Sequence, residues 1–243
     1  MKARFFLVIA SLLFSNCAKN ENINDAIVED KVYDFPVRPG TEKWNAFKTE
    51  QERIDALQVP ECLLKEMSTE NLIITCINYP AFGHYNAYTN VVVGMERVID
   101  NFNGLQELMK RKDAPDKLLV FYSALDSTMN IDNKLIDHQY WPIRCTYFEY
   151  MLSVDDILNK MSDGLCRQLL KEAQKKLWIK IDNQDKYSSD CYIPTLLTMA
   201  KLLIKLDSGI FEKNEEIIRF THTGILSEET ATCIIDLSKT FIK

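Results

Sequence analysis

The sequence predicts an all-α protein, built either as an irregular array of short antiparallel helix pairs or as a compact bundle. Seven glycines and seven prolines in 243 residues are few for an all-β chain, which usually needs such residues in its many turns. From about residue 49 onwards, apolar residues recur at helical spacing between polar and proline punctuation. An apolar share of 47% suits a chain of this length that buries a core.

The first predicted helices each begin at a recognisable start signal. Thr49 can cap one helix, and Pro60 suits the first turn of the next. Ser68 or Thr69 can cap a third helix, which the residues before Pro80 stop. The expected buried positions of these three helices are Ile54, Leu57, Cys62, Leu63, Leu64, Met67, Leu72, Ile73, Cys76 and Ile77.

The remaining predicted helices follow from similar apolar stripes. Ser153 is expected to start one of them in the manner of a capping box, and residues 165–177 mark the longest. Residues 145–151, CTYFEYM, have the aromatic and β-branched content of a strand, but their spacing does not decide between strand and helix. No motif repeats at a fixed period. The stripes are Val91 to Phe102, Leu105 to Met109, Leu118 to Leu125, Val154 to Met161, Leu165 to Leu177, Ile193 to Ile204 and the C-terminal residues 227–243.

The first 16 residues have the order of an export signal. Lys2 and Arg4 precede an apolar run over residues 5–14, and small or polar residues follow it. A run of ten residues is too short to span a bilayer, which needs about 20 in a helix. We therefore expect residues 1–16 to be a signal peptide that is removed.

Cys17 directly follows this apolar run, in the sequence LFSNC. The arrangement resembles the lipobox of bacterial lipoproteins, which implies that Cys17 is diacylated and becomes the first residue of the mature chain. Ser15 suits the pattern, whereas Phe14 and Asn16 depart from its usual residues, and the alternative is plain secretion with cleavage elsewhere. Acyl chains at Cys17 would hold the protein on a membrane.

The chain after Cys17 divides into a tether and one domain. Residues 17–32 are polar and turn-prone, which is typical of a tether, and residues 33–243 are expected to form a single helical domain. The net charge is −6, with 35 acidic and 29 basic residues. This balance argues against nucleic acid as a partner and means that the lipid, rather than overall charge, would hold the protein on an anionic surface.

Few residues suggest chemistry. The three histidines, His84, His138 and His222, show no metalloprotease or zinc-ligand spacing. The sequence contains no glycine-rich phosphate loop and no GxSxG motif. It therefore predicts no metal site, no cofactor and no catalytic residue.

Six cysteines remain after Cys17. Cys62, Cys76, Cys166 and Cys233 lie among apolar residues of predicted helices, where a free cysteine behaves as a small hydrophobe. An exported compartment also permits up to three disulfides. Cys145 and Cys191 are the first pair expected to form a bridge, if one exists.

Two aromatic segments are candidates for ligand contact. Residues 79–90, YPAFGHYNAYTN, include His84, Tyr85 and Tyr88, and the segment DHQYW includes His138 and Trp141. Aromatic faces beside amide groups can bind a sugar or a peptide. The alternative interpretation is that these rings plug the ends of neighbouring helices.

Residues 33 to about 127 resemble a recurrent family of exported proteins of Bacteroidetes bacteria. The likeness rests on FPVRPGTEKW, then MSTENL, then CINYP, and it covers roughly half of the mature chain. It implies export but no activity, because the family has no established one. Physically, Pro36, Pro39 and Gly40 suit a rigid entry turn, and Trp44 suits a packed lid.

These observations predict a lipid-anchored cell-envelope protein, on the outer membrane, with a binding or scaffolding role toward a protein or carbohydrate partner. Helical arrays expose extended surfaces suited to such a role. One alternative is an exported hydrolase whose scattered residues, such as His84 or His138, converge in a cleft. Another is a purely structural component of the envelope.

Overall fold

The computed structural model describes residues 30–125 and 141–242, and every regular element in these two ranges is helical. There are fourteen α-helices and two 3₁₀ helices, and no strand, in this part of the chain. The all-α prediction is therefore confirmed. The elements are α1 (Glu42–Asn45), α2 (Glu50–Ala56), α3 (Glu61–Glu66), α4 (Thr69–Ile77), η1 (Phe82–Ala87), α5 (Val91–Asp100), α6 (Asn103–Lys110), α7 (Ala114–Ala124), α8 (Trp141–Leu152), α9 (Asp155–Leu158), α10 (Asp163–Asp182), η3 (Ser189–Cys191), α11 (Tyr192–Leu206), α12 (Ser208–Lys213), α13 (Glu215–Thr223) and α14 (Glu228–Phe241).

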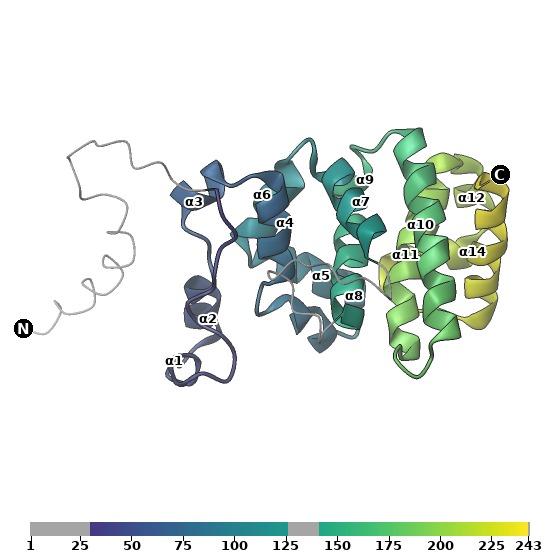
Figure 1. Ribbon diagram of the computed structural model, residues 1–243. Helices are drawn as coiled ribbons and strands as arrows, with labels where there is room; N and C mark the ends of the chain where they lie inside the picture. Colours follow the sequence, from purple (N-terminus) through teal and green to yellow (C-terminus); the bar gives the residue numbers. More distant parts are fainter. Residues whose placement is uncertain (1–29, 126–140, 243) are drawn as a thin grey trace, which may run out of the picture.

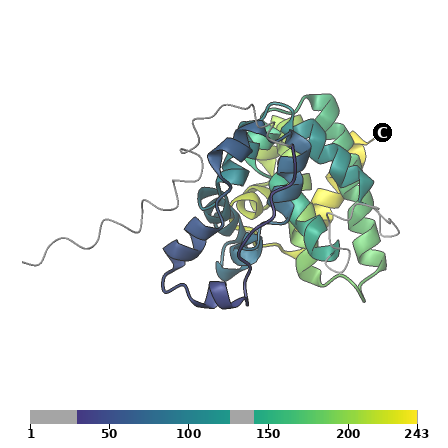
Figure 2. The same ribbon diagram turned by 60° about the vertical axis from the view of Figure 1, so that its left-hand side comes forward.

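The helices follow one another along the molecule in nearly the order of the sequence. Figure 1 shows α1 and α2 at one end, α4 to α8 in the middle, and α10 to α14 at the other end. Within this order α4 packs against α6 and α7, α7 against α8, α8 against α11, and α11 against both α10 and α14. Figure 2, turned by 60°, keeps the first helices and the last ones on opposite sides.

One connected apolar core runs through the array, from Phe35 to Ile234. Its centre includes Phe102, Phe148 and Phe220, whose side chains are fully buried. Stacked rings join distant segments: Tyr79 lies 4.0 Å from Phe102 between ring centroids. Burial of such large apolar rings is expected to contribute much of the stability of the fold.

Most predicted helix starts are confirmed. Thr49 forms a capping box with Glu52, and the Ser68 hydroxyl accepts a hydrogen bond from the backbone of Asn71. Pro60 is the N-cap of α3 rather than a residue of its first turn. The longest described helix is α10, over Asp163–Asp182, as expected.

Two further sequence predictions differ from the structure. Ser153 caps no helix, because its hydroxyl donates to the carbonyl oxygen of Tyr150 at 2.8 Å and α9 begins after Val154. Cys62 is exposed rather than buried, because it lies on the outer side of the short helix α3. Residues 145–151, whose spacing did not decide between strand and helix, lie within α8.

The loops before α3 and α6 are joined by amide side chains. The backbone N–H of Val59 donates to Asn103 Oδ1 at 3.0 Å, and Asn103 Nδ2 donates to the Val59 carbonyl at 2.7 Å. Gln58 accepts from the backbone N–H of Asn103 at 3.0 Å and donates to the carbonyl of Asn101 at 2.9 Å. Four backbone groups, three in the loops and one in the first turn of α6, are thereby satisfied.

Long cationic side chains close the C-terminal ends of several helices. Arg111 donates to the carbonyl of Leu64 in α3 at 3.1 Å, and Arg144 donates to that of Ile77 in α4 at 2.8 Å. Lys160 donates to the carbonyl of Met109 in α6, and Lys176 donates to the carbonyl of Leu125, the C-cap of α7. Each cation comes from a later part of the chain and meets the negative end of a helix dipole.

Asp30, three residues before the predicted start of the domain, already contacts the helical array. Asp30 Oδ1 accepts from the backbone N–H of Ser68 and from Asn71 Nδ2, both at 2.9 Å. These hydrogen bonds lower the pKa of Asp30. The predicted entry turn follows, where Gly40 has a φ of 85°, a conformation that favours glycine.

Helix α5 is held unusually close to its neighbours. A side chain at Gly94 would place its Cβ 2.3 Å from the carbonyl oxygen of Tyr85 in η1, so only glycine permits this contact. Asn90 caps α5 and also donates to the carbonyl of His222, at the end of α13, at 3.0 Å. This bond joins residues 132 positions apart.

Candidate functional site

The predicted aromatic loop folds as η1, which packs beside α5 and directs two of its rings onto α8. Phe82 is fully buried and stacks on Tyr147 with 4.0 Å between ring centroids. Tyr85 is 6% exposed, and its ring lies 4.5 Å from that of Tyr150. Burial raises the pKa of Tyr85 to about 12. Tyr85 therefore offers a ligand little surface.

Two of the predicted contact residues are exposed. Tyr88 is 42% exposed at the C-terminal end of η1. His84 is also exposed, and its Nδ1 lies 3.7 Å from Glu50 Oε1 of α2. Residue His138 lies outside the described residues, and so does the side chain of Trp141, although its backbone begins α8. Among the described candidates, only His84 and Tyr88 face solvent.

The histidines bear on the hydrolase alternative. His84 has an acidic neighbour, Glu50, but no serine, threonine or cysteine contact is recorded for its ring within the described chain. His222 lies exposed at the end of α13, where its backbone carbonyl contacts Asn90. An imidazole beside a carboxylate, without a nucleophile, is not by itself a hydrolytic site.

The densest group of polar side chains is buried between α7, α8, α10 and α11, and we call it the buried cluster: Tyr122, Cys145, Glu149, Lys180 and Thr195. Glu149 Oε1 accepts from the hydroxyls of Tyr122 and Thr195, both at 2.9 Å, and from the Cys145 thiol at 3.6 Å. Glu149 Oε2 accepts from Lys180 Nζ at 2.6 Å. The side chains of Glu149 and Lys180 are 0% and 1% exposed.

Every donor of the lysine in this cluster is used. Besides Glu149, Lys180 Nζ donates to Thr195 Oγ1 and to the carbonyl of Cys191, both at 2.8 Å. A buried charge is tolerable only when it is paired and hydrogen-bonded in this way. Since the ammonium group has three protons and three acceptors, it has no free position for a substrate.

The electrostatics of the buried cluster also argue against reactivity. Burial disfavours the ammonium form of Lys180, but the adjacent Glu149 carboxylate outweighs burial, so the pKa of Lys180 is raised. Burial raises the pKa values of Tyr122 and Cys145 well above the ordinary range. Lys180 stays charged and the Cys145 thiol stays protonated, which makes both groups poor nucleophiles.

Sequence reasoning missed the buried cluster, although a signal was present. Glu149 is the one acidic residue in the aromatic run 145–151, and Lys180 continues the apolar stripe of α10 through Ala173 and Leu177. A charge on an otherwise apolar helix face indicates a buried partner. Glu149 and Lys180 are 31 positions apart in the sequence, so their pairing is not evident until the fold is known.

The cysteines of the described chain are all free thiols. Cys76, Cys145 and Cys166 are buried, which agrees with small apolar residues rather than reactive ones. Of the suspected pair, Cys145 belongs to the buried cluster, where its thiol contacts Glu149, and Cys191 contacts the cluster through its carbonyl, which accepts from Lys180.

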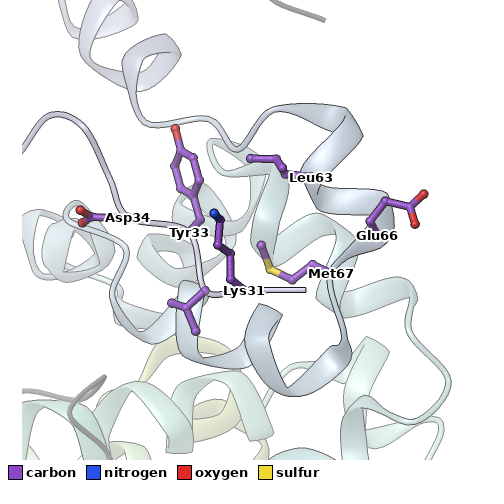
Figure 3. Close-up of a pocket in the computed structure, with 7 residues that line it drawn as sticks. Lys31, Tyr33, Asp34, Leu63, Glu66 and Met67 are labelled. Atoms are coloured by element: carbon purple, nitrogen blue, oxygen red, sulfur yellow. The ribbon is translucent and has the colours of Figure 1, made fainter. Parts of the chain in front are cut away.

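A groove of about 400 Å³ lies at the end of the array where the chain enters. It runs between the extended residues 31–34 and α3, and its lining includes Tyr33, Leu63 and Met67. Figure 3 shows the carboxylates of Asp34 and Glu66 pointing away from it to opposite sides. The groove thus lacks the convergent polar groups that define a catalytic or small-molecule site.

Neither a metal centre nor a membrane-spanning helix is found among the residues that the structure describes. No group of three histidine, cysteine, aspartate or glutamate side chains there could hold a metal ion. No helix of residues 30–125 or 141–242 is long and apolar enough to cross a membrane.

Comparison with other proteins gives no family. No protein-family model, no curated protein and no solved structure matches this chain. Any functional interpretation therefore rests on the chain's own residues.

Proposed function

We propose that this chain is a lipid-anchored protein of the cell envelope, attached through Cys17, whose helical array is a binding or scaffolding module. One observation carries the proposal: Cys17 directly follows a basic and then apolar segment with the order of an export signal. Acyl chains gain about 0.8 kcal/mol per buried methylene, which makes such an anchor effective.

The geometry of the described residues supports a binding role over a catalytic one. The buried cluster is closed and unreactive, and the exposed pair of His84 and Glu50 lacks a nucleophile. The extended array offers its outer helix faces to partners. The resemblance of residues 33–127 to exported proteins of Bacteroidetes agrees with an envelope location, on the outer membrane.

The anchor is tested by intact mass and N-terminal peptide mapping of the membrane fraction. The cells produce the wild-type chain, Cys17→Ala and a matched control, Cys62→Ala, which removes an exposed thiol of α3. We expect the wild type and the control to begin at an acylated Cys17, and Cys17→Ala to leave the membrane. A soluble wild-type chain with an unmodified Cys17 would overturn the proposal.

The binding role is tested by cross-linking the anchored protein in intact cells. We expect a specific adduct, and we expect it to be lost when the exposed residues His84 and Tyr88 are replaced, in His84→Ala and Tyr88→Ala. Loss of the adduct without loss of helicity would locate the face. Absence of any adduct would favour the alternative of a purely structural role.

A further inference from the structure

The outer face of α10 combines three cations with a tryptophan. Arg167, Lys171 and Lys175 are exposed, and Trp178 is 44% exposed, the largest exposed aromatic ring of the described chain. At 100° per residue, these four positions fall within an arc of about 80° over about 16 Å of helix. We call Arg167, Lys171, Lys175 and Trp178 the cationic face.

The two lysines of this face are not neutralised by nearby acids. No salt bridge within the described residues involves Lys171 or Lys175. Arg167 donates to the carbonyl of Phe241 at 3.4 Å and lies over its ring, which fixes α14 beside the face. The acids nearest in sequence are Asp163, at the start of α10, and Glu172, which is partly buried. The exposed Asp182 falls in the same arc, about 10 Å beyond Lys175 at the end of the helix.

The positive charge on α10 contrasts with the charge of the whole chain, and it lies on an outer helix of the array. The whole chain has a net charge of −6, so three adjacent cations on one helix face are a local reversal of its charge. Figures 1 and 2 place α10 on the outside of the array, in the half opposite the residues that follow Asp30. A tether of about 13 residues between Cys17 and Asp30 spans at most about 45 Å, so the acyl anchor leaves the array free to tip towards the membrane.

We propose that the cationic face docks on a membrane surface of anionic phospholipid, giving the anchored array a second point of attachment. Each lysine or arginine near an anionic surface strengthens binding, and tryptophan favours the headgroup region because its ring is both apolar and polar. Lipid fits this combination better than an acidic protein does, because the exposed ring lies in line with the cations rather than in a pocket. The proposal adds a lipid contact to the proposed function and rests on it, because the anchor at Cys17 would hold the array near the membrane.

The test uses the unacylated chain from residue 18 to residue 243, which retains the entire described core. Its co-sedimentation is measured with vesicles of phosphatidylcholine alone and of phosphatidylcholine with phosphatidylglycerol. We expect binding only to the anionic vesicles, and less of it at high salt. Reversing two charges, in Lys171→Glu/Lys175→Glu, should weaken this binding by more than about 20-fold, since each cation contributes about fivefold.

A matched control has the same change in net charge. Lys110 and Lys112 are also exposed, in the other half of the array, so Lys110→Glu/Lys112→Glu should leave most of the binding intact. The fluorescence of Trp178, obtained as the difference from Trp178→Phe, should shift to the blue on anionic vesicles only.

Three results would overturn the proposal. They are equal binding to neutral vesicles, equal weakening by the two double variants, and salt-sensitive self-association through the cationic face in place of vesicle binding. The vesicle test does not depend on acylation, so failure of the anchor at Cys17 and failure of the cationic face are distinguished.

Discussion

Glu149 and Lys180 are charged residues that are fully buried. Both charges lie inside the core, and each is acceptable only because the other is present. Replacing both with apolar groups is known in general to be less costly than removing one, because a single removal leaves an uncompensated charge.

Glu149→Gln should lower the free energy of unfolding by about 3–5 kcal/mol, because it leaves the Lys180 ammonium buried without a counter-charge. Urea denaturation followed by circular dichroism measures the loss. The matched control is Glu216→Gln, which breaks an exposed pair with Arg219 and should change stability little.

The double variant Glu149→Leu/Lys180→Met adds a sharper test of the same pair. Its loss should be smaller than the sum of the losses in Glu149→Leu and Lys180→Met, since the two groups interact directly. Strict additivity of the two single changes would show that Glu149 and Lys180 do not stabilise each other.

At the scale of elements, the sequence predicted most helices because apolar spacing and start signals coincide there. Thr49 and Ser68 cap helices as expected from their positions before apolar stripes, and Ser227 caps α14 in the same way. The C-terminal helix ends in lysine and begins with acid, as its dipole prefers. Local chemistry is sufficient in these cases.

The sequence was less informative where distant contacts decide the outcome. Helices α12 and α13 were not among the predicted ones, and Ser153 bonds backwards to Tyr150 instead of capping α9. Of the candidate site, the aromatic loop was recognised, but burial of Tyr85 depends on α8, 60 or more residues later. Such packing cannot be read from local spacing.

Helix α5 supplies a test of close packing. Gly94→Ala should destabilise the protein by about 1–3 kcal/mol, because the new Cβ meets the Tyr85 carbonyl and forces η1 and α5 apart. In an isolated helix the same change would be favourable by about 1 kcal/mol. The midpoint of thermal unfolding shows whether Gly94→Ala destabilises or stabilises the protein.

Gly164, in the first turn of α10, provides the control for that substitution. A Cβ there would come no closer than 3.9 Å to another residue, the Ser162 hydroxyl. Gly164→Ala should therefore leave stability unchanged or raise it slightly. A stabilising Gly94→Ala would show that α5 does not need its tight contact.

The C-terminal ends of helices give a second test at this scale. Arg144→Met removes the donor to the Ile77 carbonyl and to Asn78 Oδ1, and it should cost about 1–3 kcal/mol because part-buried acceptors lose that partner. Arg97→Met, which removes only an exposed pair with Asp100, is the control. Equal effects of the two changes on urea midpoints would contradict a capping role for Arg144.

For the whole molecule, buried phenols predict sensitivity to alkali. Burial raises the pKa values of Tyr85 and Tyr187 to about 12, and it raises that of Tyr122 further. Because the folded pKa exceeds the unfolded value of about 10, these groups stabilise the fold fully below pH ~10, and stability falls as pH rises through the folded values. Lys180, whose pKa is also raised, adds to the loss in the same direction.

The expected result is cooperative loss of helicity above pH ~10, together with a rise in tyrosinate absorbance. Circular dichroism and ultraviolet absorbance measure both on one sample. Tyr85→Phe should move the midpoint to higher pH, since one buried phenol no longer titrates. Tyrosine titration near pH ~10 without loss of helicity would contradict the burial of these rings.

The cations that close helix ends also set the order in which the chain can finish folding. The donors for α3, α4, α6 and α7 arrive 47 to 67 residues after the carbonyls that they serve. A chain that emerges from its N-terminus therefore carries open helix ends until later segments follow. Unlike a regular repeat protein, whose units complete one another in turn, this array is completed in overlapping steps, and premature termination before Lys176 would leave at least the end of α7 without its donor.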